Sequence, residues 1–184
     1  YVFMFNNEIY MCPETSSINE IRIYKCNNFP NKWSYEMTLI KNVKAADSML
    51  FEKDNYWWLI SNISTCESID FAHNLSIFFS KKGPLTNEWQ EHKNNPLCNN
   101  SKKSRNAGII FENNEIIRVS QAQGFDKYGK DINFNVIKDT SEDNYIEKEI
   151  DYKVYKNIKS LFNYKNIHHF CKIDNDIIFD FNDS

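Results

Sequence analysis

The segment Phe3-Met4-Phe5-Asn6-Asn7-Glu8-Ile9-Tyr10 decides the fold, because it places an asparagine pair between two short apolar stretches. Asn and Asp tolerate the left-handed backbone that a tight hairpin turn requires. The same pattern returns at residues 50–58, 110–117 and 170–178, and the turn dipeptides begin at residues 6, 54, 113 and 174. Each of the four segments is therefore predicted to be a β-hairpin.

A second strand pair follows each of the first three hairpins. Its predicted strands are residues 20–24 and 33–36, then 75–79 and 89–91, then 132–136 and 145–147, and an aromatic residue opens the last strand each time. The turns recur at intervals of 48, 59 and 61 residues, which is the spacing of propeller blades with loops of varying length. The sequence thus predicts an all-β chain with about three and a half four-stranded blades.

The predicted blade units are approximately residues 1–40, 47–95, 105–150 and 167–184 of one β-propeller domain or a fragment of one. No convincing helix is expected. Residues 152–162 have a weak helical period, and a loop with one turn of helix fits this segment equally well.

Composition excludes several functional classes. The 184 residues are 41% hydrophobic and 26% charged, as in a globular protein, and the net charge of −3 gives no general attraction for nucleic acid. The five cysteines are odd in number and widely spaced, and they form no CxxC pair. This argues against a zinc site and against a disulfide framework. It favours a reducing, cytoplasmic setting. No apolar run reaches the roughly 20 residues of a membrane span. No phosphate-binding glycine loop or nucleophile elbow occurs, and no cofactor is expected. The pair His168-His169 has no acidic or Cys partner at ligand spacing, so no metal is expected either.

Polar residues stand at equivalent ends of the predicted first hairpins. In a propeller these ends meet at one mouth of the central channel, where ligands bind, and the residues concerned are Glu14, Asp47, Asn62, Arg105, Gln121 and His168. Carboxylates and amides hydrogen-bond hydroxyl groups, so the set predicts a sugar or polyol site. The alternative is that these residues are solvated polar side chains of loops.

Two acids in one pocket suggest glycoside chemistry, in which one carboxyl group acts as an acid and the other as a base or nucleophile. Asp47 and Glu14 are the only acids of the predicted mouth. Trp57 and Trp58 alternate on an inner strand, so that one of them could face the channel, and packing between blades is the alternative role for both.

Several motifs together resemble one family. They are residues 8–16 with 20–24 and 29–33, residues 47–51 with 56–59, residues 75–79 with Gly83-Pro84, Trp89, His92 and Asn95-Pro96, and residues 105–108 with Gln121 and Tyr128-Gly129. The chain resembles the five-bladed propeller domain on the N-terminal side of plant glucosamine inositolphosphorylceramide transferase. That domain also occurs in bacterial proteins of surface-glycan loci, some fused to formyltransferase-like domains, and its architecture is similar to that of glycoside hydrolase families 43 and 32.

The resemblance implies five blades, with one blade before Tyr1 and further strands after Phe181. It adds Tyr128 to the predicted substrate-binding residues, which are Arg105, Gln121, His168 and Asn62. It also implies a propeller that binds a sugar, nucleotide-sugar or glycan in bacterial surface-polysaccharide synthesis, accessory to a fused or partner transferase or formyltransferase domain. A glycosidase or glycosyltransferase that uses Asp47 and Glu14 is the alternative. A protein-interaction propeller is a third possibility and would expose a large apolar patch.

Overall fold

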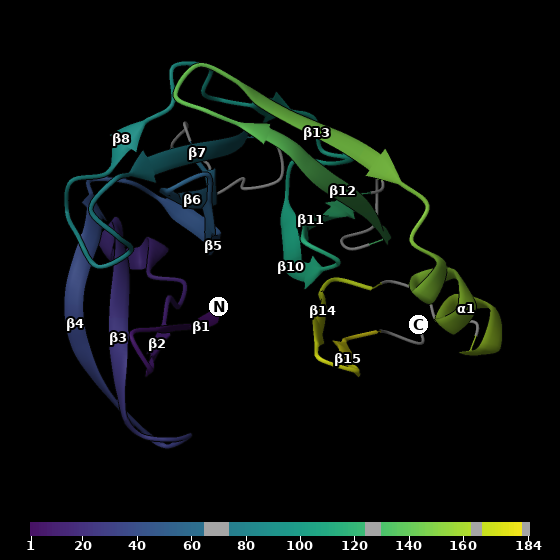
Figure 1. Cartoon of the computed structure of the whole chain (residues 1–184), viewed down its shortest axis with the longest axis horizontal. Coiled ribbons are helices and arrows are strands. Elements are labelled where there is room, and N and C mark those ends of the chain that lie inside the picture. The colour runs from purple at the N-terminus through teal and green to yellow at the C-terminus, as the bar shows by residue number, and fades with distance from the viewer. Residues whose placement is uncertain (65–73, 124–129, 163–166, 182–184) are drawn as a thin grey trace. The chain divides into compact units, whose positions relative to one another are not determined.

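The computed structural model describes residues 1–64, 74–123, 130–162 and 167–181 (Figure 1). It divides into two compact units, Tyr1–Asn99 and Asn100–Ser184, which are described separately below. Nearly all regular structure in both units is antiparallel β-sheet, which confirms the predicted all-β class.

The first unit contains two sheets. One has the order β1-β2-β3-β4, formed by Val2–Phe5, Glu8–Met11, Glu20–Asn28 and Lys32–Lys41, with a short 3-10 helix at Ser16–Ile18. The other has the order β5-β6-β7-β8, formed by Ala45–Lys53, Tyr56–Ile63, Asn74–Ser80 and Gln90–Glu91, and β9 (Cys98–Asn99) also pairs with β7. Both sheets therefore contain the two predicted hairpins in sequence order.

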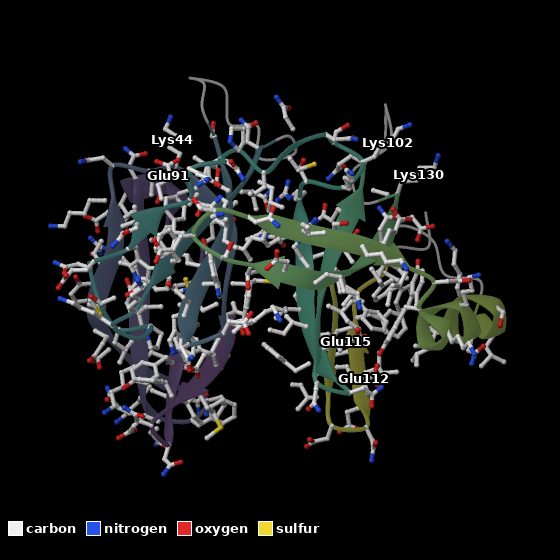
Figure 2. All side chains as sticks on the ribbon, turned by 45° about the horizontal axis from the view of Figure 1, so that its top comes forward. Lys44, Glu91, Lys102, Glu112, Glu115 and Lys130 are labelled. Carbon is white, nitrogen blue, oxygen red and sulfur yellow. The ribbon has the colours of Figure 1, made fainter. Side chains whose placement is uncertain are left out.

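The second unit contains one four-stranded sheet and one hairpin. The sheet has the order β10-β11-β12-β13, formed by Asn106–Glu112, Glu115–Ala122, Asp131–Thr140 and Tyr145–Ile150. The helix α1 (Lys153–Phe162) follows, and then the hairpin of β14 (Phe170–Ile173) and β15 (Asp176–Phe179). Figure 2 shows Glu112 and Glu115 beside the turn of the β10–β11 hairpin, and Lys102 and Lys130 at its opposite end. We call that opposite end the open end of this hairpin.

The predicted hairpin turns are confirmed by the backbone. Asn6 and Asn7, Asp54 and Asn55, and Asn113 and Asn114 all have φ between 51° and 64°, so both central residues of each turn are left-handed. Such turns match the twist of the strands that they join. In the fourth hairpin Asp174 has φ 53°. The chain thus uses Asn and Asp where many proteins use glycine.

The core of the first unit lies between its two sheets. Trp58 is fully buried, its ring packs on Phe79, and its indole N–H donates to the Lys53 carbonyl at 3.1 Å. Trp57 packs on Phe3 and Phe5 of the other sheet, with ring centroids 6.2 and 5.6 Å apart. Both tryptophans therefore pack within the core, which is the alternative role considered for them above.

One motif of the resemblance completes a sheet edge. The side chain of Asn95 accepts a hydrogen bond from the Ile77 N–H at 2.9 Å and donates one to the Ile77 carbonyl at 2.8 Å. The Asn95 amide therefore makes the two backbone hydrogen bonds with Ile77 that a residue of a neighbouring strand would make beside β7. His92 is buried next to it, and its Nδ1 accepts from the Asn94 N–H at 3.2 Å. This His–Asn–Pro motif has a structural role.

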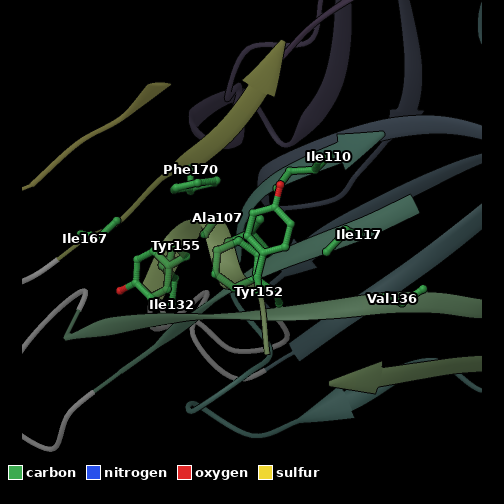
Figure 3. Packing of buried hydrophobic residues seen from close by; sticks show 11 residues of the cluster. Ala107, Ile110, Ile117, Ile132, Val136, Tyr152, Tyr155, Ile167 and Phe170 are labelled. Atoms are coloured by element: carbon green, nitrogen blue, oxygen red, sulfur yellow. The ribbon is translucent and has the colours of Figure 1, made fainter. Parts of the chain in front are cut away.

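The sequence left residues 152–162 open between a helix and a loop with one helical turn, and the structure has the ten-residue helix α1 there. Figure 3 shows Tyr152 and Tyr155 in the core of the second unit together with Phe170. Both tyrosine rings also pack on Phe134, at 4.7 and 5.2 Å between centroids. The helix is stabilised mainly by this packing of Tyr155 and of Tyr152, which directly precedes the helix, and a weak local period does not reveal such distant contacts.

Candidate functional site

Three of the predicted site residues lie inside strands, which corrects their predicted positions just outside them. Asp47 is the third residue of β5, Asn62 is the seventh of β6, and Gln121 is the seventh of β11. The strands are longer than the sequence pattern suggested, because Asn62 and Gln121 pair with Ala46 and Ile132 in the ladders, and β5 continues past Asp47 to reach the first of these pairs. These three side chains therefore project from a fixed backbone.

Asp47 lies in a β-bulge. Ala46 pairs with Asn62 and Met49 pairs with Ile60, so that Asp47 and Ser48 together oppose the single residue Ser61. The buried Ser61 hydroxyl lies 3.1 Å from the Ala46 carbonyl and 2.8 Å from the Ser48 hydroxyl, which fixes the bulge.

The backbone of Asp47 has φ 52°, in the left-handed region. A bulge of this kind redirects a side chain, and Asp tolerates the conformation better than most residues do. Asn62, beside the bulge, is fully buried and donates from its amide to the Asn74 carbonyl at 3.4 Å. The structure thus brings Asp47 and Asn62 to the same end of the β5–β6 hairpin.

Glu14 lies in the segment after β2, and its carboxylate is exposed. It accepts a hydrogen bond from the Ser16 hydroxyl at 2.9 Å, within the same segment. The pairing of Glu14 with Asp47 as catalytic acid and base stays a prediction.

The second unit repeats the bulge. Asn106 pairs with Ser120 and Gly108 with Val119, so Ala107 is the extra residue. Gly108 has φ 140°, and a Cβ added to it would overlap with the Phe170 carbonyl oxygen and lie 3.1 Å from its carbon. The glycine therefore allows β14 to lie close against β10.

Arg105 and Gln121 are neighbours at this bulge. The Gln121 N–H donates to the Arg105 carbonyl at 2.8 Å. The Gln121 amide is buried, donates to the Asn106 carbonyl at 3.4 Å, and accepts from Gln123 Nε2 at 2.8 Å. The Arg105 side chain is partly exposed at the open end.

His168 precedes β14 and is fixed by Asp180. The Asp180 carboxylate accepts the backbone N–H groups of His168 and His169 at 2.9 and 2.6 Å, and it lies 3.4 Å from His168 Nδ1. Tyr128, the remaining predicted site residue, lies outside the described residues. The gathering of residues from both units at one mouth stays a prediction.

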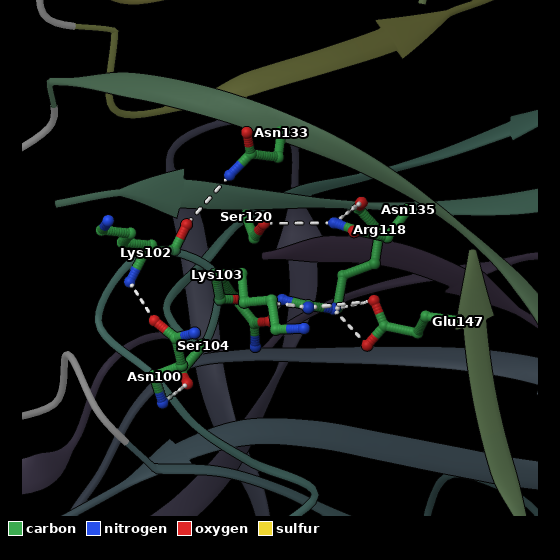
Figure 4. Close-up of polar contacts among 10 residues, drawn as sticks. Asn100, Lys102, Lys103, Ser104, Arg118, Ser120, Asn133, Asn135 and Glu147 are labelled. Atoms are coloured by element: carbon green, nitrogen blue, oxygen red, sulfur yellow. Dashed lines mark hydrogen bonds and ion pairs between the residues drawn. The ribbon is translucent and has the colours of Figure 1, made fainter. Parts of the chain in front are cut away.

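A buried ion pair near the open end was missed by the sequence analysis (Figure 4). Arg118 on β11 is 1% exposed, and its Nε and Nη2 bind the Glu147 carboxylate of β13 at 2.9 to 3.0 Å. Nη1 donates to Asn106 Oδ1 at 3.3 Å, and Nη2 also donates to the Lys103 carbonyl at 3.0 Å. One guanidinium thus joins two strands, the bulge and the loop before β10. A signal was present, because Arg118 interrupts the apolar run Ile116-Ile117-Arg118-Val119.

Tyr145 borders this ion pair. Burial, followed by the negative charge of Glu147, raises the pKa of the Tyr145 hydroxyl well above its usual value. The Tyr145 phenol therefore stays neutral beside the ion pair of Arg118 and Glu147.

Among the residues that the structure describes, no group of three or more His, Cys, Asp or Glu side chains is arranged to hold a metal ion. No helix of the described part of the chain is long and apolar enough to cross a membrane.

Comparison with known proteins gives a consistent result. Residues 1–176 match the family described as glucosamine inositolphosphorylceramide transferase 1, N-terminal. A protein of Arabidopsis thaliana named glucosamine inositolphosphorylceramide transferase 1 is 31% identical over 175 residues, which are 92% of this chain and 22% of that protein. A protein of the same name from Oryza sativa subsp. japonica is 38% identical over 113 residues, or 60% of this chain and 15% of that protein. The chain thus spans less than a quarter of these relatives.

Proposed function

The chain belongs to the glucosamine inositolphosphorylceramide transferase 1 N-terminal family, and we propose that it is a carbohydrate-binding propeller domain of a glycan-modifying transferase. It would bind a sugar, nucleotide-sugar or glycan and present it to a transferase or formyltransferase domain in the same protein or in a partner. The printed name of the plant relatives, glucosamine inositolphosphorylceramide transferase 1, supports a role in glycan synthesis.

The observation that carries the proposal is the repeated bulge at one end of two hairpins. In each hairpin a buried serine lies opposite the bulge, Ser61 in β6 and Ser120 in β11, and a buried amide follows it, Asn62 or Gln121. Buried amides bonded to backbone atoms preorganise the neighbouring polar groups. Such fixed polar groups suit the recognition of sugar hydroxyls.

The five-bladed fold, the cytoplasmic location and the pathway are part of the same proposal. A ring of five blades accounts for two four-stranded sheets, one five-stranded sheet and a further hairpin, arranged in sequence order along the chain. The free thiols of Cys12, Cys26, Cys98 and Cys171 support a reducing, cytoplasmic compartment. A bacterial surface-polysaccharide pathway remains our proposed context, although the relatives compared above are plant proteins.

Glycan binding can be tested with the full-length protein by isothermal titration calorimetry against a panel of neutral glycans and nucleotide-sugars. Asp47→Asn removes one charge and keeps a residue that tolerates the left-handed backbone. We expect this variant to weaken binding about tenfold, as for the loss of one charged hydrogen bond. The matched control is Asp54→Asn, because Asp54 also has a left-handed backbone, φ 55°, and lies at the other end of the same hairpin.

The results separate the alternatives. Equal binding by the Asp47 and Asp54 variants, or no binding of any panel member, contradicts the proposed site. Turnover of a bound glycan that is abolished by Asp47→Asn and by Glu14→Gln would instead favour a glycosidase or glycosyltransferase. Glu14 is exposed, so its substitution should leave the fold intact.

A further inference from the structure

The loop before β10, residues 100–105, has an unusually well-fixed backbone. Asn100 organises it, because its carbonyl accepts the N–H groups of Lys103 and Ser104 at 3.0 and 2.8 Å. Its side-chain oxygen accepts the Lys102 N–H at 3.0 Å, and its own N–H donates to the Ser104 hydroxyl at 2.8 Å. Ser104 is fully buried. We call residues 100–105 the basic loop.

The sheet also binds three successive carbonyl groups of the basic loop. The Ser101 carbonyl accepts the Gln123 N–H at 3.2 Å, and the Lys102 carbonyl accepts Asn133 Nδ2 at 2.9 Å. The Lys103 carbonyl accepts Arg118 Nη2 at 3.0 Å. These carbonyl groups are directed toward the sheet, and Figure 4 shows the contacts of the Lys102 and Lys103 carbonyls. The residues Lys102 and Lys103 are themselves exposed.

Positive charge gathers at this end of the second unit. Lys102 and Lys130 both lie at the open end of the β10–β11 hairpin (Figure 2), and Lys103 is adjacent in sequence. The neighbouring carboxylates are already engaged. Asp131 accepts hydrogen bonds from Tyr155 and Lys159, and Glu147 is bound by Arg118. Within the described residues, no carboxylate forms an ion pair with these three lysines.

We propose that the basic loop, together with Lys130, binds a phosphoryl group of the ligand. This inference rests on the proposed function and specifies that the carbohydrate ligand carries a phosphodiester or a pyrophosphate. A loop of solvated lysines needs no buried arginine to fix its backbone. A loop that binds an anion gains from this rigidity, because the backbone loses little further entropy when the ligand arrives. Ammonium groups act as point charges for phosphate oxygens.

Two sources could supply this phosphoryl group, namely a nucleoside diphosphate of a sugar donor and a phosphoinositol headgroup of a lipid acceptor. Calorimetry on the full-length protein at low salt distinguishes them with two matched pairs of probes. UDP is compared with uridine, and glycerophosphoinositol with myo-inositol. We expect at least one phosphorylated probe to bind about tenfold more tightly than its phosphate-free counterpart, since one good charge-assisted contact is worth about that factor.

The variant Lys102→Gln with Lys103→Gln should remove that preference. Its control, Lys148→Gln with Lys153→Gln, deletes the same charge from two other exposed lysines of the same unit. Because all four side chains are exposed, thermal unfolding should show that both variants fold like the parent. The preference should also weaken as salt rises, since exposed charges are screened.

The inference is overturned if phosphorylated and phosphate-free probes bind alike, or if the two double variants behave alike. In that case neutral glycan binding that depends on Asp47 would leave the proposed function intact. Conversely, a phosphate preference that depends on Lys102 and Lys103, without any recognition of sugar, would support the anion site and contradict the proposed carbohydrate site.

Discussion

Replacing Arg118 by Met should destabilise the second unit strongly. The variant leaves the Glu147 carboxylate, whose side chain is 15% exposed, without its cation, and it removes the donors of the Lys103 carbonyl and Asn106 Oδ1. Breaking a buried ion pair by removing one partner costs about 3–5 kcal/mol. Because water still reaches part of Glu147, we expect the lower end, about 3 kcal/mol. Measured domains have unfolding free energies of about 5–15 kcal/mol, so this loss is large.

The double variant Arg118→Met with Glu147→Met tests the cause of that loss. It removes both charges, so no buried carboxylate is left unpaired, and about half of the loss should be recovered. A third variant, Lys138→Met, breaks the exposed Lys138–Glu115 pair of the same sheet, whose side chains are 44% and 45% exposed. That change should cost less than about 1 kcal/mol.

The assay can resolve the two units. The four tryptophans, Trp33, Trp57, Trp58 and Trp89, all lie in Tyr1–Asn99, so tryptophan fluorescence reports on the first unit. Urea-dependent hydrogen exchange of peptides from β10 to β13 reports on the second unit. If Arg118→Met lowers the stability of β10–β13 by less than about 1 kcal/mol, or if the double variant is as unstable as the single one, the ion-pair argument is refuted.

Three further outcomes are expected. Gly108→Ala should displace the β14–β15 hairpin because its Cβ overlaps with the Phe170 carbonyl, and faster hydrogen exchange in residues 170–179 would show it. A hydrogen bond from Lys172 lowers the pKa of the Glu112 carboxyl group in the folded protein. This pair therefore stabilises the folded protein fully at pH values above the unfolded carboxyl pKa, about 4.3. The stabilisation is lost as the pH falls through the lower pKa of the folded state. Glu112→Gln should therefore flatten the loss of stability on acidification, measured by urea midpoints between about pH 6 and pH 3. Ser61→Ala removes two hydrogen bonds of the bulge, one buried and one partly buried, and should cost about 1–2 kcal/mol, read from tryptophan fluorescence in urea.

The hairpins could be predicted from the sequence because their signal is local. A left-handed turn depends on the two residues that form it, and Asn113 and Asn114 adopt it as expected. The bulges could not be predicted in the same way, because they depend on the register of the partner strand. Asp47 is displaced by the pairing of Met49 with Ile60, and no pattern within β5 encodes that shift.

Distant partners limit prediction of the candidate site in the same way. Arg118 and Glu147 are 29 residues apart in sequence, on strands that are not adjacent in the sheet. The helix α1 depends similarly on Phe134 and Phe170, which flank it in sequence, contact its Tyr155 and meet only in the folded core. By contrast, the proximity of Asp47 and Asn62 follows from hairpin geometry alone, and it was predicted from the antiparallel pattern.

The two bulges lie at equivalent positions of their hairpins and differ in backbone conformation and in chemistry. Counted from their turns, Asp47 of β5 and Asn106 of β10 occupy equivalent positions, and Ser61 and Ser120 lie opposite them. In β10 the position carries an amide whose oxygen accepts a hydrogen bond from the buried Arg118. In β5 it carries a carboxylate on a left-handed backbone, with Leu59 at the position that corresponds to Arg118. At the equivalent position, the second unit thus has Asn106, which holds Arg118 in place, and the first unit has the acidic residue Asp47. For this reason, Asp47 is the residue at which a test of ligand binding is most informative.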